Sequence, residues 1–329
     1  MSKTKIVTII CWSVSALVLI GLLAWFLINS VFGGWGMFTN SDSGFNIFGM
    51  NFGGFENLTG PFEVQGVKNE STTDIHSIDI NWVAGEITVV PHFGDDIQIT
   101  ESAQRRLNDN ERMKVTSNGG TLKVEFRERG SLRGNMPRKN LEVLVPYELS
   151  ENLTLLSVNT TSGKINISEF EAATLDISSV SASIDISAIV SNSIDLSTTS
   201  GAIRGNTVRA GIYDVSTVSG SINLSEANVP TLDLSTTSGS MTVSGEFDKI
   251  NTSTVSGSVN IRSNTLPSRI DSSSVSGGVV VYLPNDGEIT VSHSAVSGRF
   301  SSDIPVKMQG GAAYNFSSVS GSTNIYALG

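Results

Sequence analysis

Residues 194–203 read IDLSTTSGAI, residues 213–222 read YDVSTVSGSI and residues 232–241 read LDLSTTSGSM, so one short motif occurs three times in succession. The motif recurs from Leu156 to Ile325, and its glycine position is held in turn by Gly163, Ala182, Gly201, Gly220, Gly239, Gly257, Gly277, Gly298 and Gly321. The steps between these nine positions are 19, 19, 19, 19, 18, 20, 21 and 23 residues. A period of this size is typical of repeat architectures.

Apolar residues alternate with polar ones on both sides of each glycine. In the copy at Gly239, Leu232 and Leu234 precede the glycine by seven and five residues, and Met241 and Val243 follow it by two and four. Alternation with period two is the pattern of a β-strand, so each repeat predicts two short strands joined by a bend. Only stacking of the repeats, about 4.8 Å apart, buries these apolar faces. The chain is therefore predicted to be all-β: a single-stranded β-solenoid (β-helix) of about ten or more rungs with a period of ~19 residues.

The segment before the regular repeats, residues 63–150, is predicted to form irregular β rungs with charged loops, and residues 151–329 form the regular solenoid. Ile78 and Ile80 before Gly85, with Ile87 and Val89 after it, already fit the repeat, so the solenoid is expected to begin here. Further strands are expected around Ile97 and Ile99, at residues 114–116 and at residues 122–126, the last two joined by the turn Asn118-Gly119-Gly120.

Two charged runs interrupt this segment, at residues 105–112 and 127–139, and both are expected to be loops that project from the rod. The second run carries Arg127, Arg129, Arg133, Arg138 and Lys139. It is either a solvated loop or a binding site for an anionic cell-wall polymer or lipid headgroup.

The N-terminus has the pattern of a membrane anchor. Residues 6–28 contain no charged side chain, which is long enough for a transmembrane helix. Lys3 and Lys5 predict that residues 1–5 form a cytoplasmic tip and that the C-terminal β domain lies outside, giving a single-pass protein of the cell membrane. A cleaved signal peptide is the competing interpretation. Residues 29–62 are a Gly/Phe-rich linker, either a flexible stalk or an aromatic docking segment.

Composition and motifs argue against several classes of function. The net charge of −10 disfavours nucleic acid, which requires a basic surface. His76, His92 and His293 lack the spacing of metal ligands, the only cysteine, Cys11, lies in the predicted span, and no Gly-x-Ser-x-Gly elbow is present. We therefore expect no enzymatic activity.

The strand Leu141–Pro146, LEVLVP, followed by Ser-Gly rungs behind one N-terminal span, resembles the bacterial membrane-anchored β-strand-repeat family of adhesin-like domains of unknown function. The resemblance covers residues 63–329. It implies a non-enzymatic, extracytoplasmic adhesin-like or interaction module of the bacterial envelope, with a cell-wall polymer, glycan or envelope protein as partner, and it supplies no catalytic residues. The alternative that it implies is an envelope-stress accessory or scaffold protein acting on a membrane partner.

One column of residues, six positions before the glycines, is a candidate cation site. It contains Asp176, Asp195, Asp214 and Asp233 in consecutive repeats, on the outer face of the predicted strands. Adjacent like charges are unfavourable in a sheet, and Ca²⁺ bridging these carboxylates would relieve the repulsion. The alternative is a solvated acidic face that blocks lateral sheet association.

Two further features allow interpretation from sequence. The Ser/Thr columns, such as Thr198, Thr217, Thr236 and Thr254, form either a ladder that satisfies backbone groups of the bends or an outward hydroxyl face for a glycan or ice. After Thr323 and Ile325 only four residues remain, so the C-terminal rung lacks a cap. This rung is expected to dock on a partner or on a second copy of the chain.

Overall fold

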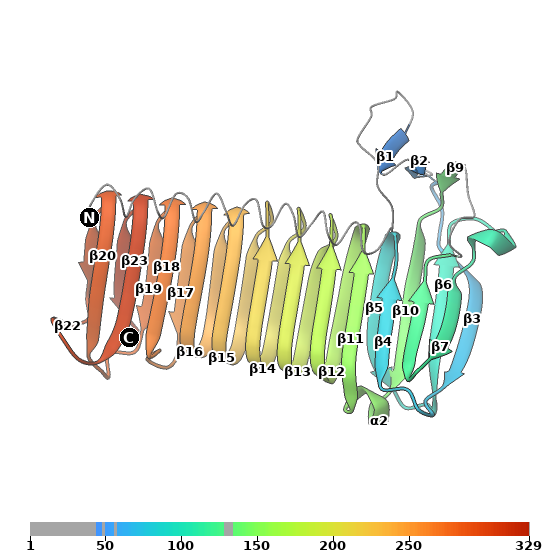
Figure 1. Cartoon of the computed structure of the whole chain (residues 1–329), viewed down its shortest axis with the longest axis horizontal. Helices are drawn as coiled ribbons and strands as arrows, with labels where there is room; N and C mark the ends of the chain where they lie inside the picture. The colour runs from blue at the N-terminus through green and yellow to red at the C-terminus, as the bar shows by residue number, and fades with distance from the viewer. Residues whose placement is uncertain (1–43, 48–49, 56–57, 128–133, 329) are drawn as a thin grey trace.

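The computed structural model describes residues 44–47, 50–55, 58–127 and 134–328 (Figure 1). A sheet of 21 strands winds into an elongated β-solenoid of about nine turns, so the predicted fold class is confirmed, with slightly fewer turns than expected. The predicted cytoplasmic tip and transmembrane helix, residues 1–28, lie outside the described residues. Within the described part of the chain, no helix is both long enough and apolar enough to cross a membrane.

Five long strands form the regular centre: β12 (Ser162–Ser179), β13 (Ser183–Thr198), β14 (Ile203–Thr217), β15 (Ile222–Ser238) and β16 (Met241–Ser256). Each is bent in the middle and forms two arms, so the Ser-Gly turn supplies only one of the two bends in each turn of the solenoid. The second bend lies six residues after each glycine position, at a residue with positive φ: Glu169 (61°), Ala188 (52°), Thr207 (54°), Glu226 (53°) and Gly245 (155°). Neighbouring strands pair in parallel and almost without register shift, which stacks like positions in columns.

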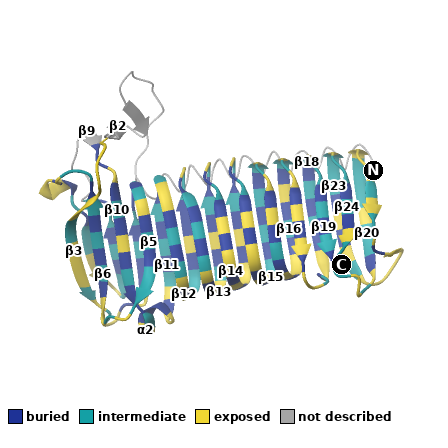
Figure 2. Ribbon diagram, turned by 180° about the vertical axis from the view of Figure 1, so that it is seen from behind, coloured by how far each residue is buried: buried dark blue, intermediate teal, exposed yellow. Residues whose placement is uncertain are grey.

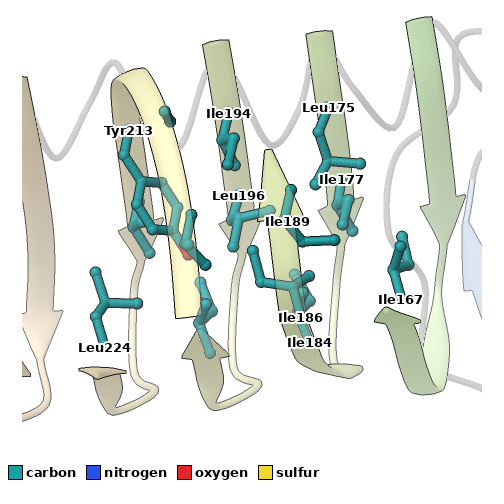
Figure 3. Close-up of a cluster of buried hydrophobic side chains, with 14 of the residues drawn as sticks. Ile167, Leu175, Ile177, Ile184, Ile186, Ile189, Ile194, Leu196, Tyr213 and Leu224 are labelled. Atoms are coloured by element: carbon teal, nitrogen blue, oxygen red, sulfur yellow. The ribbon is translucent and has the colours of Figure 1, made fainter. Parts of the chain in front are cut away.

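The core runs along the inside of the solenoid, between two walls. Buried and accessible residues alternate along the long central strands, which gives the chequered pattern of Figure 2. The predicted apolar positions point inward, as Ile184, Ile186, Ile194 and Leu196 do in Figure 3. Ile189, which follows the second bend, is also buried.

The first turn consists of β4 (Ser77–Asn81) and β5 (Ala84–His92), which confirms the expected start of the solenoid. β4 pairs with β11 (Leu153–Thr160) and β5 with β12, and Gly85 lies directly beside Gly163. On the other side of this turn lie β8 (Thr121–Glu125) and β10 (Lys139–Pro146). Three antiparallel strands then close the N-terminal end: β3 (Glu63–Ser71), β6 (Asp96–Ala103) and β7 (Lys114–Asn118). The predicted Gly-Gly turn joins β7 to β8.

Three short elements accompany this end of the rod. They are the 3₁₀ helix η1 (Asp109–Glu111), the helix α2 (Tyr147–Ser150) and a small sheet of β1 (Gly44–Ile47), β2 (Met50–Phe55) and β9 (Gly134–Met136). Within the Gly/Phe-rich linker, β1 and β2 pair as an antiparallel hairpin, although frequent glycines disfavour a strand. Backbone hydrogen bonding alone can form such a hairpin, because it does not depend on side chains.

At the C-terminal end, the order of the strands in the sheet differs from their order in the chain. It contains β17 (Val259–Ser263), β18 (Arg269–Ser276), β19 (Val279–Leu283), β20 (Ile289–Ser297), β21 (Phe300–Ser302), β22 (Val306–Lys307), β23 (Ala312–Ser320) and β24 (Thr323–Ala327). β23 is inserted between β18 and β20, and β24 between β19 and β21. The expectation that the last rung of the chain is an open edge is therefore wrong: β20 and β21 form that edge, and among the described strands only β22 pairs with part of it.

Candidate functional site

The four predicted aspartates lie in one straight row on the outside of the solenoid. Asp176 is directly opposite Asp195, Asp195 opposite Asp214, and Asp214 opposite Asp233. Their side chains point outward because the residues on either side of each, such as Ile194 and Leu196 around Asp195, are buried in the core. The structure thus brings together all four residues that the sequence singled out.

Amide side chains continue this row toward the C-terminal end. Asn251 Nδ2 donates to Asp233 Oδ1 over 2.6 Å, and Asn315 Nδ2 donates to Asp271 Oδ1 over 2.7 Å. Within the described part of the chain, Asp176, Asp195 and Asp214 have no such hydrogen bond and no ion pair. Amide hydrogen bonds therefore stabilise the carboxylates at the C-terminal end of the row, whereas those in the centre have no such partner.

In the centre of the row, the pKa values of the three carboxyl groups are raised. Desolvation between adjacent turns, followed by repulsion from Asp214 and Asp176, raises the pKa of Asp195 to about 6. The pKa of Asp176 and that of Asp214 are also raised, mainly by desolvation and then by the charges of Asp79 and Asp233, respectively. The carboxylate form is thus destabilised most in the middle of the row.

A groove of about 460 Å³ follows the C-terminal half of this row. We call it the Asp/Ser groove; its lining comprises Asp214, Asp233, Leu234, Ser235, Asn251, Thr252, Ser253, Asp271, Ser272, Ser273, Asn315 and Ser317. A column of serines, two residues after each Asp or Asn position, forms its second row of hydrogen-bonding groups. The groove offers carboxylates, amides and hydroxyls that repeat from one turn to the next.

The outer face of the other wall also carries a polar groove, of about 440 Å³. Asp185 there pairs with Lys164 over 3.2 Å and with Arg204 over 3.1 Å, and Asn166, Asn206 and Asn223 line the same groove. Because its charges are paired, this groove differs from the Asp/Ser groove, which carries excess negative charge.

The proposed cation ladder stays a prediction. Across the described residues, no group of three or more His, Cys, Asp or Glu side chains is arranged to hold a metal ion. The aspartates meet only in successive pairs along the row, and Ca²⁺ needs six to eight oxygen ligands. Serine hydroxyls, backbone carbonyls or water would have to complete the coordination of any ion bound there.

The threonine column faces the core, and the interpretation as a ladder that satisfies backbone groups is confirmed for Thr198 and Thr217, whereas the hydroxyls of Thr236 and Thr254 have no hydrogen-bond partner among the described residues. Thr198 Oγ1 accepts the N–H of Gly201 over 3.1 Å, and Thr217 Oγ1 accepts that of Gly220 over 3.0 Å. Thr236 and Thr254 are equally buried. These hydroxyls cannot form an outward face for a glycan or ice.

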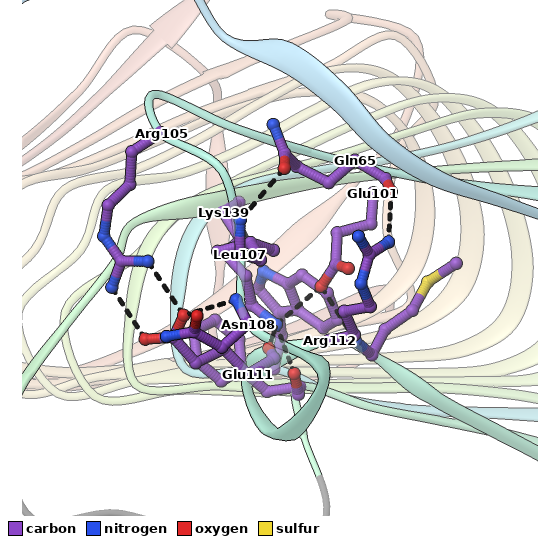
Figure 4. Close-up of polar contacts among 11 residues, drawn as sticks. Gln65, Glu101, Arg105, Leu107, Asn108, Glu111, Arg112 and Lys139 are labelled. Carbon is purple, nitrogen blue, oxygen red and sulfur yellow. Dashed lines mark hydrogen bonds and ion pairs between the residues drawn. The ribbon is translucent and has the colours of Figure 1, made fainter.

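The first charged run folds over the end of the core instead of projecting from it (Figure 4). Glu111 is buried, and Arg105 binds it through two hydrogen bonds of 2.7 and 2.8 Å. Chiefly because of this contact, the pKa of Glu111 falls to about 2. The predicted projecting loop is wrong here, because the open end of the core has to be covered.

Lys139 was also placed in a projecting basic loop, and that expectation is wrong. It begins β10 and is completely buried, with Nζ 2.6 Å from Glu101 Oε1 and 2.7 Å from the carbonyl oxygen of Glu111. Nζ also lies over the ring of Phe126, 3.9 Å from its centroid. Burial lowers the pKa of Lys139 to about 8 although Glu101 opposes the shift. Arg129 and Arg133 lie outside the described residues.

The histidines do not assemble a catalytic centre. His76 Nδ1 is 3.1 Å from Ser77 Oγ, and the His76 ring is exposed. His92 contacts the carbonyl oxygen of Asp96, and His293 packs beside Phe300. The absence of enzymatic activity stays an expectation.

Residues 75–325 match the protein family described as Toastrack DUF4097. No curated protein matches the chain. Among solved structures, a "putative lipid binding protein" from Parabacteroides distasonis is similar, with 13% identity, 80% of this chain and 96% of that chain covered, and a TM-score of 0.52. A "putative adhesin" from Bacteroides fragilis has 13% identity, the same coverages and a TM-score of 0.44. At 13% identity, the likeness to the first of these two structures establishes the fold alone.

Proposed function

Because the chain belongs to the Toastrack DUF4097 family, we propose that it is a non-enzymatic, adhesin-like module, anchored in the cell membrane by residues 6–28, that binds a polymer of the bacterial envelope or a glycan outside the cell. The observation that carries this proposal is the Asp/Ser groove. Its hydrogen-bonding groups repeat with the turns of the solenoid, about 4.8 Å apart, so a ligand with repeated hydroxyl or amine groups meets the same partners many times.

Weak contacts that repeat along a rod give useful affinity without a deep pocket. Each hydroxyl or amide contributes a hydrogen bond worth about 0.5–1.5 kcal/mol, and carboxylates bind more strongly. Adhesion therefore suits a shallow, regular groove better than catalysis does, because catalysis requires groups converging on one reacting atom.

The test is a pull-down of the full chain in detergent with isolated cell wall and immobilised glycans, with and without calcium. We expect saturable binding that is lost in the variants Asn251→Arg and Ser273→Arg, which fill the groove from its outer side. Asn223→Arg, in the groove of the other wall, is the matched control and should bind normally. No saturable binding of the natural chain to any of these materials would overturn the proposal.

Recovery of one specific membrane protein, without binding to wall or glycan, would favour the alternative function. The chain would then be an envelope-stress accessory or scaffold protein. Loss of this partner in variants of the exposed edge strand β20, and not in groove variants, would assign the contact to the open end of the rod.

A further inference from the structure

The last turn of the chain fills a slot between two earlier turns. From β12 to β19 the turns stack in the order of the chain. β23 and β24, residues 312–327, instead lie between β18 and β19 on one side and β20 and β21 on the other, as Figure 1 shows for β23. We call residues 312–327 the inserted turn, and β20 with β21 the end turn.

The slot requires a particular sequence in the segment that fills it. Tyr314 and Phe316 of the inserted turn are buried there, and the Tyr314 hydroxyl donates to the carbonyl oxygen of Pro267 over 3.0 Å. A Cβ atom on Gly321 would lie 2.0 Å from the carbonyl oxygen of Gly277, so this position must be glycine. Among the nine copies of the motif, only the inserted turn has aromatic residues seven and five positions before the glycine. The segment that fits the slot best is therefore the inserted turn itself.

The end turn, which closes the slot, is held mainly on one side. Among the described strands, only the two residues of β22 pair with the outer side of β20. Val291, His293 and Ala295 face the core from β20 but are only partly buried, whereas Tyr314 and Phe316 on the neighbouring strand are buried. Because the end turn has a single complete neighbour, it separates from the rod at a lower cost than an interior turn does, and the slot opens.

The order of the strands in the chain also leaves the inner edge of the slot free during folding. β20 and β21 are synthesised before the inserted turn, yet the inserted turn occupies the edge of β18 and β19 in the folded chain. This edge therefore stays free, or is vacated, until residue 327 has been made. A free strand edge pairs with any segment of suitable sequence, and exchange of such segments between chains is characteristic of repeat proteins.

A short, exposed hinge, residues 308–311, carries the chain from the end turn to the inserted turn. Lys307 and Ala313 lie on opposite sides of Thr290, so the hinge crosses two strand spacings, roughly 10 Å. Its two glycines have φ angles of 89° and 77°, which turn the chain back toward its own slot. A hinge that extends instead of turning back delivers the inserted turn to a neighbouring chain.

We infer that two copies of the chain exchange their inserted turns, so that each copy fills the slot of the other. The occupant is a second copy because its inserted turn makes the same hydrogen bonds and buries the same side chains in the slot, and only the path of the hinge differs.

The inference goes beyond the proposed function, since the exchange does not depend on any ligand. It also changes the composition of the Asp/Ser groove. Asn315 and Ser317 line that groove, and Asn315 donates to Asp271 there. In the exchanged dimer, these two residues of one copy complete the groove of the other, so a ligand in either groove contacts both chains.

The experiment detects an inserted turn that has moved between chains. Two full-length chains with different affinity tags are co-expressed in a Cys11→Ala background. One carries Ser273→Cys and the other Ser317→Cys, since these serines lie directly opposite each other at the inner edge of the slot. The purified protein is treated in detergent with a bismaleimide that spans at most two strand spacings, roughly 10 Å. The matched control combines Ser253→Cys with Ser273→Cys, which lie opposite each other on turns that stack in chain order.

We expect covalent dimers of the two tagged chains to be at least about fivefold more abundant for Ser273→Cys with Ser317→Cys than for the control pair, because only the inserted turn moves between chains. No such dimers, or equal amounts in the control, would overturn the inference. Association through the outer edge of β20 alone would also give no such dimers, because it would leave the two cysteines four strand spacings apart, roughly 19 Å.

The length of the hinge provides a second test with two opposite variants. Deletion of Met308, Gln309 and Gly310 leaves one residue to span about 7 Å, so the inserted turn does not reach the slot of its own chain while β22 stays paired. We expect this deletion to raise the yield of covalent dimers at least about twofold, and insertion of Gly-Ser-Gly-Ser after Gln309 to lower it. A yield that is unchanged or shifts the other way in either variant would contradict exchange through this hinge.

Discussion

Tyr213 shows how the repeat accommodates a side chain larger than its column allows. The column otherwise holds residues such as Leu175, Ile194 and Leu232, and Tyr213 is completely buried in it. The space comes from Gly205, where a Cβ atom would lie 2.6 Å from the Tyr213 hydroxyl oxygen. Tyr213 fits into this column because position 205 is a glycine, since the two residues share one volume in a densely packed core.

The different hydrogen bonding of two buried tyrosines, Tyr213 and Tyr314, predicts different effects on stability when each is replaced by phenylalanine. The Tyr213 hydroxyl is buried without a hydrogen-bond partner among the described residues, whereas the Tyr314 hydroxyl donates to the carbonyl oxygen of Pro267 over 3.0 Å. Tyr213→Phe should leave the free energy of unfolding unchanged or raise it by up to about 1 kcal/mol, while Tyr314→Phe should lower it by about 1 kcal/mol. Gly205→Val should cost about 1–3 kcal/mol through overpacking. Urea denaturation measures all three, and a large loss for Tyr213→Phe would contradict the unpartnered hydroxyl.

The aspartate row predicts a dependence of stability on pH. The pKa of Asp195 rises from 3.8 to about 6 on folding, so the folded chain binds this proton more tightly than the unfolded chain does. Its contribution to stability is therefore greatest below about pH 4 and is lost as pH rises toward 6. Asp195→Asn should raise the free energy of unfolding above pH 6 by about 1 kcal/mol after discounting for solvent screening, and should have little effect at pH 3.

A control variant on the other wall is expected to have the opposite effect on the free energy of unfolding. Asp185 is paired with Lys164 and Arg204, so Asp185→Asn should lower stability slightly at neutral pH.

If Ca²⁺ occupies the row, adding it should raise the melting temperature of the natural chain more than that of Asp195→Asn, and a chelator should reverse the gain. An unchanged melting temperature of the natural chain in both conditions would refute the cation ladder.

At the scale of the strand and turn, the two bends of the solenoid differ in how far the sequence reveals them. The Ser-Gly turn is evident because turns stack there without room for a side chain: a Cβ atom on Gly220 would lie 1.8 Å from the carbonyl oxygen of Gly201. The second bend was missed because four of its five residues are Glu, Ala, Thr and Glu, which do not favour positive φ. Stacking against identical bends on both sides offsets the local cost of about 1–2 kcal/mol per residue.

The inward threonines of the Ser-Gly turn provide a matched pair for a stability test. Thr217 Oγ1 accepts the N–H of Gly220, whereas Thr236 Oγ1, at the same position one turn later, is buried without a hydrogen-bond partner in the described part of the chain. Thr217→Val should lower the free energy of unfolding by about 1–3 kcal/mol, because a buried N–H loses its acceptor. Thr236→Val should be neutral or stabilising. Equal effects in thermal denaturation would show that the hydroxyl column contributes through packing alone.

At the scale of the whole molecule, the two ends of the rod are closed by different means. The N-terminal end is closed by antiparallel strands and by the buried charged residues Glu101, Glu111 and Lys139. At the C-terminal end, the last strands of the chain insert between earlier ones, so β20 is the outermost strand. The buried ion pair between Glu101 and Lys139 predicts a large effect. Lys139→Met should cost about 3–5 kcal/mol, because it leaves the carboxylate of Glu101 buried without its cation.

The control for this prediction is an exposed ion pair. Arg204→Met removes a partner of Asp185 at the surface and should cost under about 1 kcal/mol. Guanidinium denaturation compares the two variants. A similar small loss in both would mean that Glu101 takes up a proton or meets water when Lys139 is absent.

Self-association at the C-terminal end of the rod stays a prediction, and the strand expected to mediate it is the edge strand β20. Residues 291–297 of this strand have no partner on their outer side among the described strands and carry no charged side chain to discourage pairing. Sedimentation of the chain should show association that rises with concentration and is abolished by Val296→Lys. Asn324→Lys on the inserted strand β24 should not abolish it, and a natural chain that is monomeric at all concentrations would contradict the prediction.

The sequence by itself determined the all-β solenoid, its period, its first turn at Gly85 and the aspartate row, since these follow from local alternation and from the equal spacing of repeats. Only the tertiary structure decided the second bend, the burial of Lys139 and the insertion of β23 and β24 between earlier strands. These features depend on contacts between residues far apart in the chain. An edge strand pairs with whichever segment returns to it, and a buried charge depends on a partner that no local pattern identifies.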